Sequence, residues 1–220
     1  METVHTSQPT YPHNNLTIIT HPLVSHKLSI IRNKNTDRLM FRNTLKEISQ
    51  LMTFVVTQNL PLQLTQVETP LTNCESMILR APISVVSILR AGLGMSQGIM
   101  AMIPEATEGC IGLYRNHDTL EAVNYLIKLP KKHDGLYILV DPMLATGNSA
   151  IAAIEIMTKQ GISVDQIAFM ALIAAPEGVH KLHKHCPSLK IFLASLDEGL
   201  NQSAYIVPGL GDAGDRLFGS

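Results

Sequence analysis

The fold of this chain follows from one stretch, YILVDPMLATGNSA, which spans residues 137–150. It begins in an unbroken apolar run, Leu136 to Val140, and a short run of this kind is typical of a strand buried on both faces. Asp141 stands where that strand should end. Pro142 then stops strand pairing, because proline has no N–H to donate.

A small polar loop and a helical pattern come next. The loop is Thr146-Gly147-Asn148-Ser149, and the pattern that follows is formed by Ile151, Ile154 and Met157, with Gly161 as the expected stop. A helix start leaves backbone N–H groups free and its dipole favours an anion, so this layout predicts a phosphate site. The hydroxyls of Thr146 and Ser149 can add donors. Asp141 would repel a phosphate, and it fits the vicinal hydroxyls of a ribose or a bound cation.

The loop has two other interpretations. An ordinary strand-to-helix turn with an N-cap has the same pattern and no ligand. A P-loop NTPase is disfavoured, because no lysine follows Gly147.

The stretch 140–149 resembles the signature of the type I phosphoribosyltransferases, which bind phosphoribosyl pyrophosphate (PRPP). The narrower string DPMLATG, residues 141–147, is similar to the uracil phosphoribosyltransferase family. Two more stretches agree with it: ILRAGLGM at 88–95 and YIVPGLGDAGD at 205–215. The likeness runs from about His21 to the C-terminus, with the motifs in the family's order.

Length and composition indicate one domain, expected at residues 21–220, preceded by a flexible tail or arm at 1–20. The formal net charge is −1, from 17 basic and 18 acidic residues, which argues against nucleic-acid or membrane partners. Three widely spaced cysteines and the lack of an apolar leader or membrane-length apolar run predict a cytoplasmic protein.

The pattern of strands and helices predicts an α/β fold with a doubly wound, mainly parallel sheet. Strands are expected at Leu62–Val67, Met77–Arg80, Ile83–Leu89, Cys110–Tyr114, Val123–Leu129, Leu136–Val140, Ile167–Ala174 and Ile191–Ala194, with a short strand or arm at Leu16–Ile19. Helices are expected at Asp37–Val56, Met95–Met102, after Ser149, and at Glu177–His185. Arg90, Arg115, Asp141 and the Thr146 loop all follow strands, and ligands of such sheets bind at the carboxyl ends of the strands.

The resemblance implies transfer of the 5-phosphoribosyl group from PRPP to N1 of uracil, giving UMP and pyrophosphate in pyrimidine salvage. It implies Asp141 and Arg115 as catalytic residues, a hairpin lid after Arg115, and a C-terminal hood over the base. The PRPP contacts it implies are Arg90, Arg115, Asp141, Pro142, Met143, Leu144, Ala145, Thr146, Gly147, Asn148, Ser149 and Asp212. The uracil contacts are Ile206, Gly211, Asp212 and Ala213. Mg²⁺ is the implied cofactor, held mainly by PRPP and not directly by the protein.

The chain departs from the family at position 148, where glycine is usual and asparagine stands here. Asparagine tolerates a left-handed backbone better than most residues, which predicts that conformation at Asn148. The loop at Arg90 to Gly94 has two glycines, which would let an anion approach closely or serve only for packing.

Several further hypotheses remain open. The resemblance implies a homodimer or larger oligomer, and the apolar segment Leu16–Val24 is expected to lack partners within one domain. A GTP effector is also implied; its phosphates could meet Arg32, Arg38 and Arg42, although a solvated helix face is the simpler interpretation. A metal site at His180, His183, His185 and Cys186 is disfavoured by the lack of an apolar shell. The rival functions are an RNA-binding regulator and a transferase for a purine base.

Overall fold

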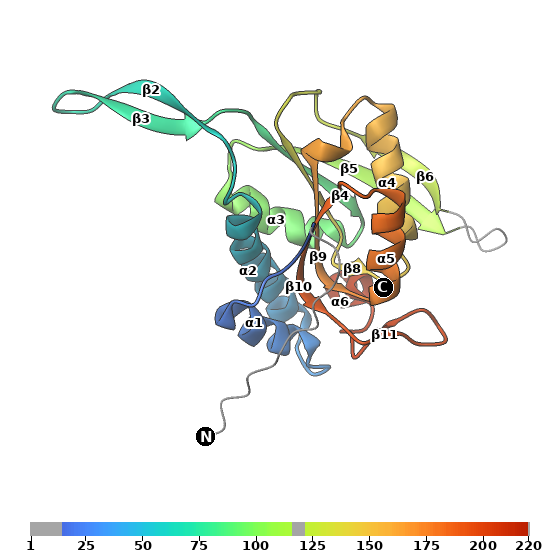
Figure 1. The fold of residues 1–220 in the computed structure, drawn as a ribbon. Coiled ribbons are helices and arrows are strands. Elements are labelled where there is room, and N and C mark those ends of the chain that lie inside the picture. Colours follow the sequence, from blue (N-terminus) through green and yellow to red (C-terminus); the bar gives the residue numbers. More distant parts are fainter. Residues whose placement is uncertain (1–14, 116–121, 220) are drawn as a thin grey trace.

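The structure is a computed structural model that describes residues 15–115 and 122–219. Its centre is an eight-stranded sheet with the order β1-β10-β9-β7-β4-β5-β6, and β8 pairs with β9 beside this path (Figure 1). All neighbours in it run parallel except β5 and β6, which are antiparallel. This is the doubly wound, mainly parallel sheet that the sequence predicts.

The strands of this sheet are β1 (Leu16–Ile18), β4 (Ile83–Leu89), β5 (Thr107–Arg115), β6 (Ala122–Lys128), β7 (Leu136–Val140), β8 (Met143–Leu144), β9 (Ile167–Ala174) and β10 (Lys190–Leu196). Two small antiparallel pairs lie outside it: β2 (Leu62–Glu68) with β3 (Asn73–Leu79), and β11 (Gly199–Leu200) with β12 (Ile206–Val207). The helices are α1 (Pro22–Arg32), α2 (Arg38–Val56), α3 (Gly92–Met102), α4 (Asn148–Lys159), α5 (Pro176–His185) and α6 (Ala213–Phe218), with a 3₁₀ turn at Val164–Gln166.

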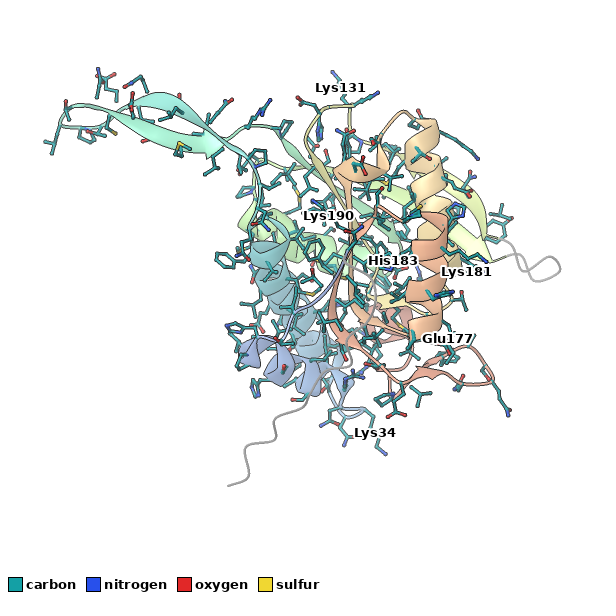
Figure 2. All side chains as sticks on the ribbon, in the orientation of Figure 1. Lys34, Lys131, Glu177, Lys181, His183 and Lys190 are labelled. Atoms are coloured by element: carbon teal, nitrogen blue, oxygen red, sulfur yellow. The ribbon has the colours of Figure 1, made fainter. Side chains whose placement is uncertain are left out.

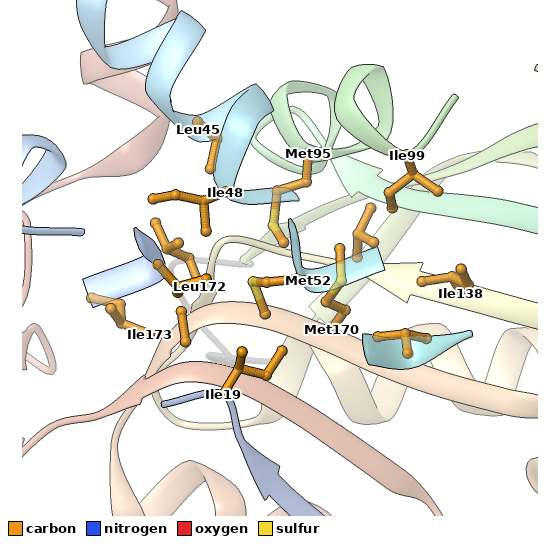
Figure 3. Close-up of a cluster of buried hydrophobic side chains, with 14 of the residues drawn as sticks. Ile19, Leu45, Ile48, Met52, Met95, Ile99, Ile138, Met170, Leu172 and Ile173 are labelled. Carbon is orange, nitrogen blue, oxygen red and sulfur yellow. The ribbon is translucent and has the colours of Figure 1, made fainter. Parts of the chain in front are cut away.

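Helices cover both faces of the sheet, and each face has its own apolar core. Helices α1, α2 and α3 lie on one face, and α4 and α5 on the other (Figure 1). Figure 3 shows the core under the first group, where Leu45 and Ile48 of α2 meet Met95 of α3 and Met170 of β9. The strands β7 and β9 contribute side chains to both cores, which explains why they are continuously apolar.

The predicted central elements are confirmed. The strands at 83–89, 136–140 and 167–174 have the expected bounds, and the helix at 38–56 begins at the expected cap, where the Asp37 carboxylate accepts from the Met40 N–H at 2.8 Å.

The N-terminal segment differs from the prediction in two ways. Helix α1 was not expected, although Pro22 at its first position and the His21 side chain as N-cap mark its start. The expectation that Leu16–Val24 lacks partners within the chain is wrong. Strand β1 pairs with β10, and Ile19 and Val24 are buried in the core.

The β2–β3 hairpin projects away from the body of the molecule (Figure 1). Most of its residues are exposed, including the large apolar side chains of Leu62, Leu64, Val67, Leu71, Met77, Ile78 and Leu79. The sequence predicts both strands but gives no sign that they leave the main sheet.

Within the described ranges, no helix combines the length and the apolar character needed to cross a membrane.

Candidate active site

A cleft opens at the carboxyl ends of β4, β5 and β7. It consists of two adjoining hollows of about 350 and 290 Å³, which share Leu113, Met143, Ser149 and Asp212 as lining residues. The first hollow reaches the loop at 145–149 and the turn before β12, and the second reaches Arg90 and Asp141. The structure therefore brings three separated sequence motifs to one edge of the sheet.

The loop at which a phosphate is predicted lies at the start of α4. Gly147 is the N-cap of this helix, with φ +81°, a left-handed conformation that side chains other than glycine rarely adopt. Ala145, Thr146, Asn148 and Ser149 line the first hollow. The first N–H groups of α4 have no carbonyl within the helix to bind, so the geometry suits a phosphate at this point.

Asn148 does not have the left-handed backbone that was expected. It is the first residue of α4, and Ala204 is the sole non-glycine residue with positive φ among those described. The left-handed position is Gly147, one residue earlier, because that residue reverses the chain into the helix. Asn148 uses its side chain instead: the amide Oδ1 accepts from Lys181 Nζ of α5 at 2.5 Å, and Figure 2 marks Lys181 on that helix.

Two carboxylates face the second hollow. Asp141 follows β7, and Asp212 is the N-cap of α6, where it accepts from the Asp215 N–H at 2.9 Å. Burial and the nearby Asp212 raise the pKa of Asp141 to about 7, although the N–H of Met143 donates to its Oδ1 at 3.3 Å and opposes that rise. A group that donates hydrogen bonds to these carboxylates, such as a ribose hydroxyl, or a cation that neutralises their charge is therefore favoured here.

The rest of the loop is held by the sheet. The Pro142 carbonyl accepts from the N–H groups of Leu172 and Ile173, both at 3.1 Å, and Met143 and Leu144 form β8 against β9. These bonds fix the loop between Asp141 and Gly147.

The glycines after Arg90 serve packing in this structure. The helix begins at Gly92, so Gly92 and Gly94 are helical, and neither has positive φ. A Cβ at Gly92 would lie 2.6 Å from the Val140 carbonyl oxygen. The structure therefore supports the packing interpretation, and anion binding at this loop stays a prediction.

Of the two arginines predicted at the site, the structure describes the side chain of Arg90 but not that of Arg115. Arg90 lines the second hollow, with its guanidinium 5.3 Å from the centre of the Phe218 ring. Arg115 ends β5; its side chain and residues 116–121, where the lid is predicted, lie outside the described residues.

The expected uracil contacts are gathered near the same cleft. Asp212 and Ala213 line it, whereas Ile206 is buried in β12 and Gly211, with φ +80°, lies just before Asp212. Neither Ile206 nor Gly211 lines the two hollows, so their role as base contacts stays a prediction.

Some residues near the site were not found from the sequence. Ser203, Ala204 and Tyr205 line the first hollow, in a turn where the Asn201 side chain accepts from the N–H groups of Ser203 and Tyr205. A polar loop rich in Asn and Ser is the one signal for this turn.

The three arginines considered for an effector are attached to the C-terminal part of the chain. Arg32 binds Asp197 at 2.5 Å, the Arg42 Nε–H donates to the Leu217 carbonyl at 2.7 Å, and the Arg38 guanidinium lies against Gly219. The simpler interpretation as a solvated helix face is wrong for Arg32, which joins a mostly buried ion pair.

The histidine-rich segment of α5 gives no metal site among the described residues. His185 instead lies 3.0 Å from Glu155 of α4, and His183 is buried.

Comparison with known proteins decides the family. The sequence profile described as uracil phosphoribosyltransferase matches residues 18–220. The chain belongs to this family. Its relatives include the uracil phosphoribosyltransferase of Rhodospirillum centenum, 50% identical over 97% of this chain and 99% of the relative. That of Listeria innocua is 51% identical over 94% of this chain and 99% of the relative.

Solved structures agree with the fold. The AQ2163 protein from Aquifex aeolicus has a TM-score of 0.87 at 34% identity, covering 92% of this chain and 97% of that one. An adenine phosphoribosyltransferase from Leishmania donovani has a TM-score of 0.56 at 13% identity, covering 89% of each chain, which supports the fold alone. The sheet of this uracil phosphoribosyltransferase family member is thus of the type I phosphoribosyltransferase kind.

Proposed function

We propose that this chain transfers the 5-phosphoribosyl group of PRPP to N1 of uracil, forming UMP and pyrophosphate in pyrimidine salvage. The observation that carries the proposal is the position of Asp141 and Asp212. They come from motifs 71 residues apart, yet both face one hollow between the phosphate loop and the C-terminal segment. Family membership selects uracil as the base.

The 5-phosphate of PRPP would lie at Ala145–Ser149, on the N–H groups at the start of α4 and the hydroxyls of Thr146 and Ser149. The pyrophosphate would lie near Arg90 in the second hollow, with Arg115 closing from the hairpin. This arrangement stretches PRPP across the cleft and presents its anomeric carbon to the base.

Bond breaking between the anomeric carbon and pyrophosphate develops positive, oxocarbenium-like charge on the ribose, as in glycoside hydrolysis. Asp141, when ionised, stabilises that charge and accepts hydrogen bonds from the ribose hydroxyls. N1 of uracil forms the new bond, its proton is released, and the bonding pair leaves with the pyrophosphate.

Mg²⁺ fits the site, because the two carboxylates repel each other and their repulsion contributes to the raised pKa of Asp141. It would be held mainly by PRPP, with Asp212 as a contact through water. When bound, it supplies positive charge that offsets the charge gained by the leaving pyrophosphate.

The uracil edge presents an acceptor, a donor and an acceptor at O2, N3–H and O4. We propose that backbone groups near Ile206, Gly211 and Ala213 recognise it, because Asp212 is the one polar side chain in 206–213 and it is assigned to PRPP. Cytosine reverses two of these groups, and a site with paired polar groups can reject such a mismatch by roughly 10⁴-fold.

The test is incubation with PRPP, Mg²⁺ and a panel of bases, with nucleotide products resolved by chromatography. UMP should be the product formed from uracil, with little CMP from cytosine and no purine nucleotide. Formation of a purine nucleotide at a higher kcat/KM than UMP would overturn the proposal in favour of the rival function.

The same assay, repeated for Ile206→Ala, separates side-chain from backbone recognition. The substitution should weaken uracil binding through lost packing and leave the preference for uracil over cytosine unchanged. Loss of that preference would place recognition in the side chain.

We also propose a homodimer in the cytoplasm, with residues 1–20 as a tail or arm on a single domain at 21–220. The projecting β2–β3 hairpin supports the dimer, because it exposes Leu64 (67%), Leu71 (95%) and Met77 (56%), and apolar side chains gathered on an extended arm favour burial by a second copy.

A GTP effector stays a proposal that rests on family resemblance. Arg32 is already bound by Asp197, so an effector phosphate would need other cations. Rates of UMP formation with and without GTP test this point.

A further inference from the structure

A mostly buried ion pair joins α1 to the segment that leads into the base-binding region. Arg32, at the end of α1, donates to both carboxylate oxygens of Asp197, at 2.7 and 2.5 Å. The side chain of Asp197 is 1% exposed and follows β10 directly. Two parallel hydrogen bonds from one guanidinium fix the orientation of the Asp197 carboxylate as well as its distance from Arg32.

The network continues to the backbone of Gly209. The Asp197 carboxylate accepts from the Gly209 N–H at 2.9 Å, and Arg32 donates to the Gly209 carbonyl at 2.7 Å. Ser195 completes it by donating to Asp197 at 2.7 Å. Both polar groups of one residue in the 206–213 segment are thus held by a single ion pair.

A second arginine supports the same segment from its other end. Arg216 of α6 donates to the carbonyls of Ile31, Asn33 and Leu210, and its guanidinium lies 4.4 Å from the centre of the Phe41 ring. The end of α1 therefore contacts Gly209 directly, and through Arg216 it is joined to Leu210 and α6, although α1 does not line the cleft.

The charged groups are all satisfied in this arrangement. Burial alone would raise the pKa of Asp197, but the hydrogen bonds from Arg32, Ser195 and Gly209 and the charge of Arg32 lower it below its ordinary value. The carboxylate is therefore ionised near neutral pH, and removing Arg32 would leave a buried charge without its partner.

We propose that Arg32 and Asp197 are positioning residues for base selection, which hold the backbone at Gly209 so that the groups near Ile206, Gly211 and Ala213 meet the pyrimidine edge. This inference rests on the proposed uracil activity. The pair touches neither substrate. It acts through Gly209, and a displacement of about 1 Å in a recognition segment is enough to cost up to about 10²-fold in rate.

The first measurement is steady-state kinetics of Arg32→Met, Arg32→Lys and Asp197→Asn. The KM for uracil should rise at least about tenfold and the preference for uracil over cytosine should fall, while the KM for PRPP stays within about twofold. Arg32→Lys keeps the charge without the planar fork, so it should resemble Arg32→Met. Unchanged uracil KM and base preference in all three variants would overturn the proposal.

The matched control is Lys27→Met. Lys27 lies on the same helix and pairs with Glu47 at 2.7 Å, so the change also removes one α1 cation from an ion pair, but from a pair that does not include Asp197 or Gly209. It should leave the KM for uracil and the base preference unchanged. An equal effect in the control would mean that α1 acts only through general stability, which would refute the positioning role.

The double variant Arg32→Met/Asp197→Asn tests whether the two residues act as one unit. Its uracil KM should be no higher than that of the worse single variant, because both changes break one network. If the increase in uracil KM in the double variant equalled the product of the two single increases, the residues would act independently and not through one network at Gly209.

Hydrogen–deuterium exchange gives a result that needs no activity. At a temperature well below unfolding, the amides of 206–213 should exchange faster in Arg32→Met than in wild type or in Lys27→Met, with the phosphate loop unchanged. If wild type makes no UMP, the proposed function fails while exchange still tests the positioning. If wild type makes UMP and exchange at 206–213 is unaltered, the positioning fails alone.

Discussion

Asp141 has to satisfy two opposed requirements. Its site surrounds it with apolar strands and a second carboxylate, and these raise its pKa to about 7. The proposed reaction requires it to be ionised beside a developing positive charge. The apolar environment that makes Asp141 costly to ionise in the free protein also strengthens its attraction to the positive charge of the transition state.

Asp141→Asn should lower kcat by about 10²-fold, because the amide keeps the shape but lacks the charge. In wild type, kcat/KM for PRPP should increase as the pH rises through about 7, since the free protein must lose the Asp141 proton. A variant with wild-type kcat would remove the catalytic role of this residue.

The same substitution should stabilise the free protein at alkaline pH. The folded pKa of Asp141 is above its ordinary value, so the stability that the neutral carboxyl contributes is complete below about pH 4 and is lost as the pH rises through about 7. Asp141→Asn avoids that loss. Thermal unfolding should show a Tm higher than that of wild type by roughly 5 °C at pH 8, a gap that closes on acidification to pH 4. A gap independent of pH would indicate another cause.

Positions 147 and 148 should respond differently to substitution. Gly147→Ala places a side chain at φ +81°, 3.1 Å from the Gly178 carbonyl oxygen, and should raise the KM for PRPP about tenfold. Asn148→Gly and Asn148→Val should behave alike, within about threefold of wild type, since each loses one exposed hydrogen bond to Lys181 from an ordinary helical residue. The measurement is the KM for PRPP. A selective defect in Asn148→Val would restore a special backbone conformation at that position.

At the scale of elements, glycines let α3 pack closely against its neighbours. A Cβ at Gly98 would lie 2.7 Å from the Ser49 Cβ and would also contact the Lys46 carbonyl, so α2 and α3 touch without a side chain between them. Gly92 has the same effect within the motif at 88–95, because a Cβ there would lie 2.6 Å from the Val140 carbonyl oxygen. The glycines of this motif therefore serve partly for packing, which keeps Arg90 and α3 next to β7.

Gly98→Ala should lower the free energy of unfolding by about 1–3 kcal/mol through overpacking, with both KM values unchanged below the Tm. Chemical denaturation measures the first quantity, and the KM values come from the assay above. The site lies at the other end of the helix, so a change in the PRPP KM would show that α3 transmits strain to Arg90.

At the scale of the whole molecule, the β2–β3 hairpin extends away from the body with its apolar side chains in solvent. No residue of this hairpin lines the cleft, and among the described residues β2 and β3 pair only with each other. An exposed apolar arm is expected to be buried by association.

Sedimentation at micromolar concentration should show at least a dimer. Replacing Leu64 and Met77 together by Glu should shift it towards monomer, since two charges per arm oppose burial. Glu68→Lys on the same strand is the control and should leave the assembly intact. A wild-type monomer would remove the dimer proposal.

The sequence by itself determined the elements whose pattern is local. Continuous apolar runs predict β4, β7 and β9 within their observed bounds, because a strand buried on both faces must be apolar throughout. The motif at 137–150 predicts the loop, the helix and the acidic residue, because capping and the free N–H groups of a helix depend on neighbouring residues. The same motifs carried the family resemblance.

Only the tertiary structure decided what depends on distant partners. The residue type of Asn148 alone predicts a left-handed backbone, yet Gly147 has that conformation and reverses the chain. The side-chain partner of Asn148 is Lys181, which lies 33 residues away. The Arg32–Asp197 pair spans 165 positions, and nothing local marks Arg32 as buried or Asp197 as its partner. Charged side chains are predicted to be exposed because most of them are. The exceptions depend on which surfaces meet when the chain is folded, and the local sequence does not show this.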